Sequence, residues 1–246
     1  QADWYAFGKF AWNTYMDATN IFKEWTAATF PIQHKKVPEV ANWLLEHSHK
    51  ACVNYMTPLG LHHIMAEGHH FGPGPWVDSL FRADWTSVYY HKANKDSIGF
   101  DRKVTGTNAI SQFHPEVQKL YGNINNCPDE FLLWFHRVPW TYQLKSGRNV
   151  WEEMVFLYDQ GVVKAREMKL KWDEVEGFLD KETFRSVRDH LFIQQKEAQW
   201  WRDACLAYFH SRSQRPFPVG TLVPPYDVNY YKNLSYPYSP GIKPKW

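Results

Sequence analysis

Two long stripes of apolar residues constrain the fold of this 246-residue chain most strongly. One stripe begins near Asp180 and repeats every three or four positions, with one gap of seven, through Phe184, Val187, Leu191, Ala198, Trp201, Cys205 and Tyr208. This spacing predicts one face of an α-helix roughly 45 Å long at about 1.5 Å per residue. The other stripe follows Asn149 and Glu152, which fit a capping box, and contains Trp151, Met154, Tyr158, Val162, Ala165 and Met168. Because no alternating strand pattern of similar length competes, the fold class is predicted to be mainly α.

Shorter helices are predicted from their start signals. Asp17 is expected to open a helix over about 17–30, and Pro38 with Glu39 another that runs to about Met56. Proline followed by an acidic residue recurs at Pro115 and at Pro128. The second of these is expected to open a short, very apolar helix over 131–138.

Two stretches interrupt the helical pattern. Residues 57–112 are rich in Gly, His, Asn and aromatic residues, so a long loop region is predicted there. Residues 215–246 hold seven of the fifteen prolines and five tyrosines. We therefore expect a helical domain over 1–214 and an extended tail over 215–246, without helix, that packs on another surface.

Composition excludes several classes of protein. The net charge is +2, from 28 basic and 26 acidic residues that are scattered, so nucleic-acid binding is not expected. No apolar run approaches the roughly 18 residues of a membrane span, so no membrane partner is expected either. The three cysteines are far apart and are expected to be buried thiols. The apolar, aromatic start of the chain suggests an internal cut in a longer protein, which leaves localisation open.

Residues 54–91 are the stretch most suited to a ligand, because Gly- and Pro-rich loops position side chains rigidly. His62, His63, His69 and His70 flank Glu67, and Trp76, Asp78, Asp84 and Trp85 follow. Zinc would need three or four ligands, for which His62, Glu67 and His70 are the candidates, but no HExxH or CxxC spacing is present. We therefore expect no metal and no cofactor.

A glycosidase interpretation needs two carboxylates about 5–9.5 Å apart, which Glu67 with Asp78 or Asp84 would supply on composition alone. The simpler alternative is that these polar groups satisfy the hydrogen bonds of an irregular loop. No nucleophile elbow, phosphate-binding loop or dinucleotide fingerprint is present. Ser146 to Arg148 are expected to form a turn before the capped helix at Asn149.

Several longer strings carry a family resemblance in a consistent order. They are ADWYAFGKFAW at 2–12, NYMTPLGLHHIM at 54–65, HHFGPGPW at 69–76, RADWTSVYYHKA at 82–93, IGFDR at 98–102, LLWFHRVPWTYQLKSGR at 132–148 and WEE at 151–153. Over roughly residues 1–212 the chain resembles the C-terminal domain of the α-glucuronidases of glycoside hydrolase family 67. The tail after Arg215 is less diagnostic.

The resemblance implies a protein with a small N-terminal α/β domain, a central (β/α)₈ barrel and this helical domain. Such enzymes remove glucuronic acid or its 4-O-methyl ether, α-1,2-linked to xylo-oligosaccharides, with inversion. Their catalytic acid and base lie in the barrel, so no catalytic residue is expected in this chain. The implied partners are that barrel, the xylo-oligosaccharide and a second copy of the protein in a homodimer.

What remains for this chain is a supporting role. We expect His62, His63, His69, His70, Trp76 and Trp85 to form a wall of the sugar pocket, and the isolated domain to be inactive. The alternative is a stand-alone carbohydrate-binding or scaffold module derived from the same domain.

Overall fold

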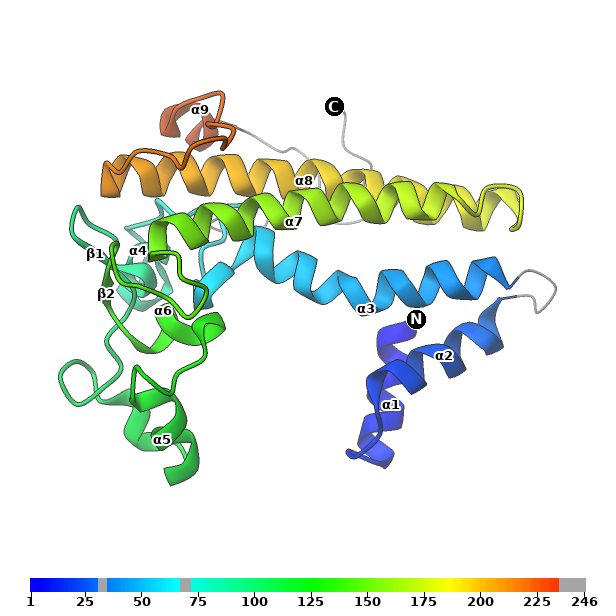
Figure 1. The fold of residues 1–246 in the computed structure, drawn as a ribbon, viewed down its shortest axis with the longest axis horizontal. Coiled ribbons are helices and arrows are strands. Elements are labelled where there is room, and N and C mark those ends of the chain that lie inside the picture. Colours follow the sequence, from blue (N-terminus) through cyan, green and yellow to red (C-terminus); the bar gives the residue numbers. More distant parts are fainter. Residues whose placement is uncertain (31–34, 67–71, 235–246) are drawn as a thin grey trace. The chain divides into compact units, whose positions relative to one another are not determined.

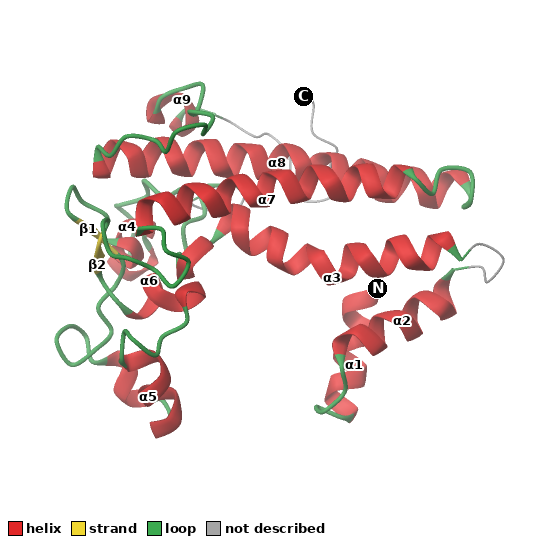
Figure 2. Ribbon diagram, in the orientation of Figure 1, coloured by secondary structure: helices red, strands yellow, loops and turns green. Residues whose placement is uncertain are grey.

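The computed structural model describes residues 1–30, 35–66 and 72–234, and it confirms a mainly helical fold (Figure 2). Within those ranges the only paired strands are β1 (Ser97–Ile98) and β2 (Val138–Pro139), which are antiparallel. The α-helices are α1 (Ala2–Trp12), α2 (Ala18–Thr29), α3 (Lys36–Met56), α4 (Ser87–His91), α5 (Pro115–Gly122), α6 (Leu132–Phe135), α7 (Val150–Asp173), α8 (Lys181–Ser213) and α9 (Val228–Lys232). Short 3₁₀ turns are η1 (Pro58–Gly60), η2 (Ala83–Trp85), η3 (Ala109–Gln112) and η4 (Asp129–Phe131).

The chain divides into two compact units. The first unit contains residues 1–52 and 163–196, and the second contains residues 53–162 together with the chain from 197 onward. Each of the long helices α3, α7 and α8 therefore contributes residues to both units (Figure 1).

The first unit has a core built from helical stripes. The end of α7 and the start of α8 run antiparallel, and α3 supplies the remaining side of the core (Figure 1). Trp172 is fully buried, lies parallel to the Phe184 ring at 6.2 Å and donates its indole N–H to the Phe184 carbonyl. The other buried members are Val37, Val40, Leu44, Ala51, Met168, Val175 and Leu191. The stripes predicted for the end of α7 and the start of α8 are therefore buried in one core, to which α3 contributes the other side.

Two helices of this unit begin close to the predicted positions, and each start is capped by an aspartate. Asp17 accepts a hydrogen bond from the Asn20 amide at the start of α2, and Asp180 accepts one from the Thr183 amide at the start of α8. Helix α3 begins at Lys36, two residues earlier than predicted from Pro38. Helix α1 was not predicted, because it buries only Ala2 and therefore has no apolar stripe for the pattern to reveal.

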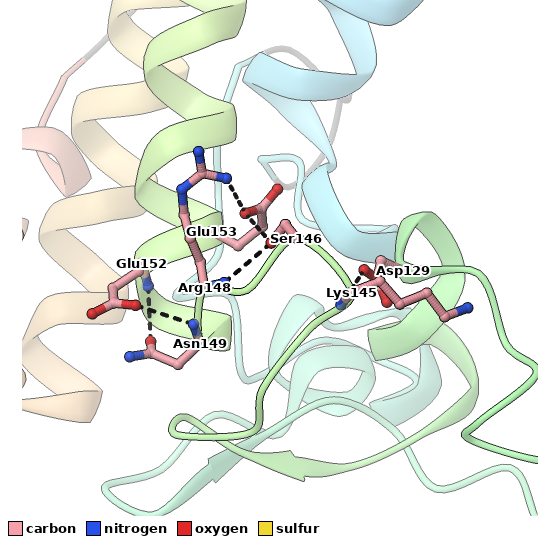
Figure 3. A network of polar contacts seen from close by, with 7 residues as sticks. All are labelled: Asp129, Lys145, Ser146, Arg148, Asn149, Glu152 and Glu153. Atoms are coloured by element: carbon pink, nitrogen blue, oxygen red, sulfur yellow. Dashed lines mark hydrogen bonds and ion pairs between the residues drawn. The ribbon is translucent and has the colours of Figure 1, made fainter.

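The start of α7, in the second unit, is organised by the predicted capping box (Figure 3). Asn149 Oδ1 accepts from the Glu152 amide at 3.0 Å, and Glu152 Oε2 accepts from the Asn149 amide at 3.1 Å. Glu153 accepts from both the Ser146 hydroxyl and the Arg148 guanidinium at 2.7 Å. Residues 146–148 therefore form a turn that is bonded to the helix it precedes, which confirms the predicted turn.

One predicted helix of the second unit is wrong in its extent. The segment after Pro128 forms the turn η4 and then α6, which ends at Phe135 instead of reaching Val138. His136 adopts extended backbone, and Val138 pairs with Ile98 across β1 and β2. An apolar run does not by itself distinguish a helix from a buried strand. Here Val138, the last residue of the run, pairs with β1 instead of continuing the helix.

The described part of the tail packs against helices of its own unit. The Trp151 indole donates to the Pro216 carbonyl at 2.9 Å, and the buried Arg202 donates to the Leu222 carbonyl. Tyr231 is buried against Ala204 and Ala207 of α8. The prediction that the tail has no helix is wrong at α9, because residues 226–234 contain no proline and Asp227 caps the Tyr230 amide.

Two simpler expectations can be compared with the structure. All three cysteines are free thiols, of which Cys127 and Cys205 are buried and Cys52 is half-buried. None of the helices in the described ranges combines the length and the apolar character that crossing a bilayer requires.

Candidate functional site

The loop that follows α3 places His62 and His63 in different surroundings. Leu59, Gly60 and His63 all have positive φ, so the backbone turns sharply between Pro58 and Ile64. His62 is exposed and sets its ring edge-on against Trp134 at 5.3 Å. Partial desolvation lowers the pKa of His62, and the positive charge of Arg102 lowers it further. His62 is therefore a neutral ring beside an aromatic surface at neutral pH.

His63 points to a different neighbour. Its Nε2 lies 2.9 Å from the Trp85 carbonyl oxygen, so this nitrogen must carry the proton and donate. Its ring also lies against Tyr90, with centroids 4.6 Å apart. Two residues that the sequence placed 22 positions apart are thus joined directly.

A cluster of aromatic rings underlies both histidines. Tyr90 and Trp134 stack with their rings nearly parallel and 5.5 Å apart. The guanidinium of Arg102 lies 3.6 Å from the Trp134 ring centre and 4.3 Å from that of Phe100, and donates to the Trp134 carbonyl. Burial lowers the pKa of Arg102 to about 10, so the side chain stays charged at neutral pH. Sequence reasoning missed Arg102, although it lies in one of the motifs that carry the resemblance.

Trp85 is exposed, with 53% of its surface accessible. It ends the turn η2, and the guanidinium of Arg82 lies 5.4 Å from its ring centre. Arg82 is itself fixed by a two-pronged ion pair with Asp84, at 2.9 and 2.5 Å. Thr86 then caps α4 by accepting from the Tyr89 amide. The indole is consequently an exposed aromatic ring that lies beside the Arg82 guanidinium.

Trp76 is half-buried and packs on the cluster formed by Ala204, Ala207 and Tyr231. The residue before it is anchored by His91, whose Nε2 donates to the Pro75 carbonyl at 2.8 Å while Nδ1 accepts from the Ala93 amide. Burial lowers the pKa of His91 to about 4, so the ring is neutral. Sequence reasoning missed this anchoring role of His91.

The other two predicted histidines, His69 and His70, lie outside the described residues, as does Glu67. On either side of them, the Ala66 amide donates to the Gly72 carbonyl and the Gly74 amide donates to the Ile64 carbonyl. Gly72 has positive φ, and a Cβ there would lie 1.8 Å from the Trp200 ring, so only glycine fits. Across the described ranges, no three His, Cys, Asp or Glu side chains form a group able to hold a metal.

The carboxylates considered for glycosidase chemistry have ordinary surroundings where they are described. Asp78 is exposed. Hydrogen bonding from Arg82 lowers the pKa of Asp84, whereas a general acid needs a raised one. Asp84 therefore serves as an ionised partner for Arg82.

An open groove of the first unit contains none of the predicted residues. Its walls are formed by Phe30 and by the turn between α7 and α8, with Thr183, Ser186 and Val187 of α8. All the described candidates belong to the second unit instead. The candidate site is therefore the aromatic surface around Trp85, His63 and His62.

This mainly helical domain, with an exposed tryptophan on an ordered turn, belongs to the family described as glycosyl hydrolase family 67 C-terminus, whose model matches residues 1–222. The match extends past Arg215 into the tail.

Similarity to curated relatives supports this family assignment. The chain is 34% identical over 220 residues to alpha-glucuronidase A of Emericella nidulans and 31% identical over 219 residues to alpha-glucuronidase A of Aspergillus tubingensis. In each comparison 88% of this chain is covered but only 25% of the relative, so the chain spans about a quarter of these proteins.

Proposed function

We propose that this chain is the C-terminal accessory domain of an inverting α-glucuronidase that removes glucuronic acid or its 4-O-methyl ether, α-1,2-linked, from xylo-oligosaccharides. The observation that carries the proposal is the family match over residues 1–222, together with relatives that are alpha-glucuronidases and of which this chain covers about a quarter. The catalytic carboxylates would then lie in a (β/α)₈ barrel outside this chain. Asp84 supports this division, since its ion pair with Arg82 suits it poorly to proton donation.

Within that enzyme, the aromatic surface of the second unit would form part of the sugar-pocket wall. Trp85 has an exposed ring of the kind that packs against the C–H face of a pyranose, while His62, His63 and Trp76 support the surrounding surface. His69 and His70 are proposed for the same wall from their place in the sequence. A stacking contact away from the scissile bond binds substrate and transition state equally, and so acts on KM.

The proposed partners are the catalytic barrel and a second copy of the protein. Large exposed rings on α1 support the idea that another surface covers them: Trp4 is 79%, Phe7 67% and Trp12 92% exposed. Replacing these three residues with Gln, Ser and Gln in the whole enzyme should loosen its domain or subunit packing. Sedimentation and limited proteolysis would reveal that loosening. Unchanged assembly and unchanged protease resistance would remove α1 from these contacts.

The first experiment is hydrolysis of a short xylo-oligosaccharide that bears a terminal 4-O-methylglucuronic acid. The whole enzyme should release uronic acid, and this purified chain, once circular dichroism confirms its helix content, should release none. Release at an enzymatic rate by the chain alone would overturn the proposal and make Glu67, Asp78 and Asp84 the catalytic candidates. Tight binding of the sugar by the chain without hydrolysis would favour the alternative of a carbohydrate-binding module.

A further inference from the structure

The Trp85 turn is held from two sides. On one side, the Arg82 guanidinium lies over the indole and is fixed by Asp84. On the other side, His63 Nε2 donates to the Trp85 carbonyl at 2.9 Å. Inside the turn, the Trp85 amide donates to the Arg82 carbonyl and the Thr86 hydroxyl donates to the Ala83 carbonyl. The bond from His63 fixes the turn to a different segment of the chain.

The backbone of His63 also has an unusual conformation. Its φ is +60°, in the left-handed region that only a few per cent of non-glycine residues adopt, Asn, Asp and His more often than the others. Strain of this kind persists where the surrounding structure fixes it, and it concentrates at ligand-binding sites. Here the strained backbone is what brings the imidazole against Tyr90 and within reach of the Trp85 carbonyl. The left-handed backbone of His63 therefore places the ring where it can bond to the Trp85 carbonyl.

We infer that His63 is a positioning residue for sugar binding, which fixes the Trp85 indole in the orientation that stacks on the substrate. The inference rests on the proposed role of Trp85 in the pocket wall. His63 itself need not touch the sugar, because its donor is already used by the Trp85 carbonyl. Its contribution is to order the platform before the substrate arrives, which reduces the entropic cost of binding.

Four substitutions in the whole enzyme separate the hydrogen bond from the backbone strain. His63→Leu removes the donor. His63→Gln keeps a side-chain N–H at nearly the position of Nε2, and should behave as the native enzyme does. His63→Asn suits a left-handed backbone better than histidine but is too short to reach the Trp85 carbonyl. His47→Leu is the matched control, because His47 also bonds through a ring nitrogen to a tryptophan carbonyl, that of Trp43 in the first unit.

The readout is the separation of KM from kcat on the glucuronylated xylo-oligosaccharide. We expect KM to rise about three- to tenfold in His63→Leu and His63→Asn, the range that one hydrogen bond supports, with kcat unchanged. His63→Gln and His47→Leu should keep the native KM. In a Trp85→Ala background, His63→Leu should add nothing, since the platform it orders is absent.

The outcomes distinguish this inference from the function it rests on. If Trp85→Ala leaves KM unchanged, the proposed wall role of Trp85 is wrong and the inference falls with it. If Trp85→Ala raises KM but His63→Asn behaves as the native enzyme, the wall role stands and the positioning role of His63 is refuted. Should His63→Leu fail to fold, His63→Asn still reports the loss of the bond, with thermal unfolding confirming that the variant is intact.

Discussion

The two units of this chain are stabilised by different means. The first unit is a helical core in which Met168, Phe184 and Leu191 lie on stripes that the sequence reveals by their spacing. The second unit contains most of the irregular backbone, and buried polar side chains such as His91, His136 and Arg202 bond to main-chain carbonyls across it. Apolar periodicity in the sequence therefore identifies a core made of helices. A loop-rich core depends instead on individual hydrogen bonds from side chains to the backbone.

The largest expected effect tests the helical core of the first unit. Trp172→Ala should lower the free energy of unfolding by about 3–5 kcal/mol, since it removes a fully buried ring and leaves a cavity between α3, α7 and α8. Urea unfolding followed by circular dichroism measures the loss. Trp85→Ala is the control, because an indole that is 53% exposed should cost well under 1 kcal/mol. Equal losses in the two variants would contradict this account of the first unit.

The second prediction concerns the buried imidazole of the second unit. Because burial lowers the pKa of His91 from 6.5 to about 4, only the unfolded chain gains a proton as pH falls between these values. The His91 contribution should therefore be constant above pH 6.5, and stability should fall by up to roughly 3 kcal/mol as pH drops to 4.

His91→Gln is the variant for that measurement. Glutamine can still donate to the Pro75 carbonyl but does not titrate, so the difference in unfolding free energy between native and variant chains should vary with pH only in this window. A difference that is flat from pH 7 to 4 would show that His91 is not buried as a neutral ring.

The third prediction compares two helical glycines, one from each unit. A Cβ at Gly161 in α7 would lie 2.5 Å from the Tyr55 amide nitrogen, so Gly161→Ala should cost about 1–3 kcal/mol. Gly8 in α1 has nothing within 4 Å of that position, so Gly8→Ala should stabilise its helix by about 0.5–1 kcal/mol. Thermal unfolding of both variants checks the opposite signs, and a stabilising Gly161→Ala would refute the close helix contact.

The smallest expected effect is the loss of the capping box at α7. Asn149→Ala should cost about 1 kcal/mol, because the Glu152 amide loses its acceptor. Asn149→Ser retains an acceptor oxygen and should recover most of the loss. Amide hydrogen exchange in the first turn of α7 should increase in the alanine variant alone. An equal increase in both variants would mean that the box does not hold this helix end.

Local signals predicted much of the fold. Asp17, Asn149 and Asp180 each cap the helix expected of them, and the stripes on α7 and α8 are buried. Those signals act within a few residues. Helix α1 escaped detection because its aromatic rings are exposed, and the last residues of the 131–138 run pair with a strand that precedes them by 40 positions.

The sequence analysis named residues of the candidate site but did not predict the contacts between them. Trp85, Trp76, His62 and His63 were named from the sequence, yet nothing local indicates that His63 bonds to a residue 22 positions away. The Arg102 contact with Trp134 spans 32 positions and was likewise invisible. Such pairs depend on how the loops are folded back, which periodicity does not encode.

The tail bonds described above also determine an order of events during folding. The hydrogen bond from Trp151 to Pro216 closes a loop of 65 residues, whereas α7 and α8 meet across the short turn between Asp173 and Lys181. Closing the longer loop costs more chain entropy, so the helical hairpin should form first and residues 216–234 should dock last. The same residues should be the first to detach when the domain opens, before its helices separate.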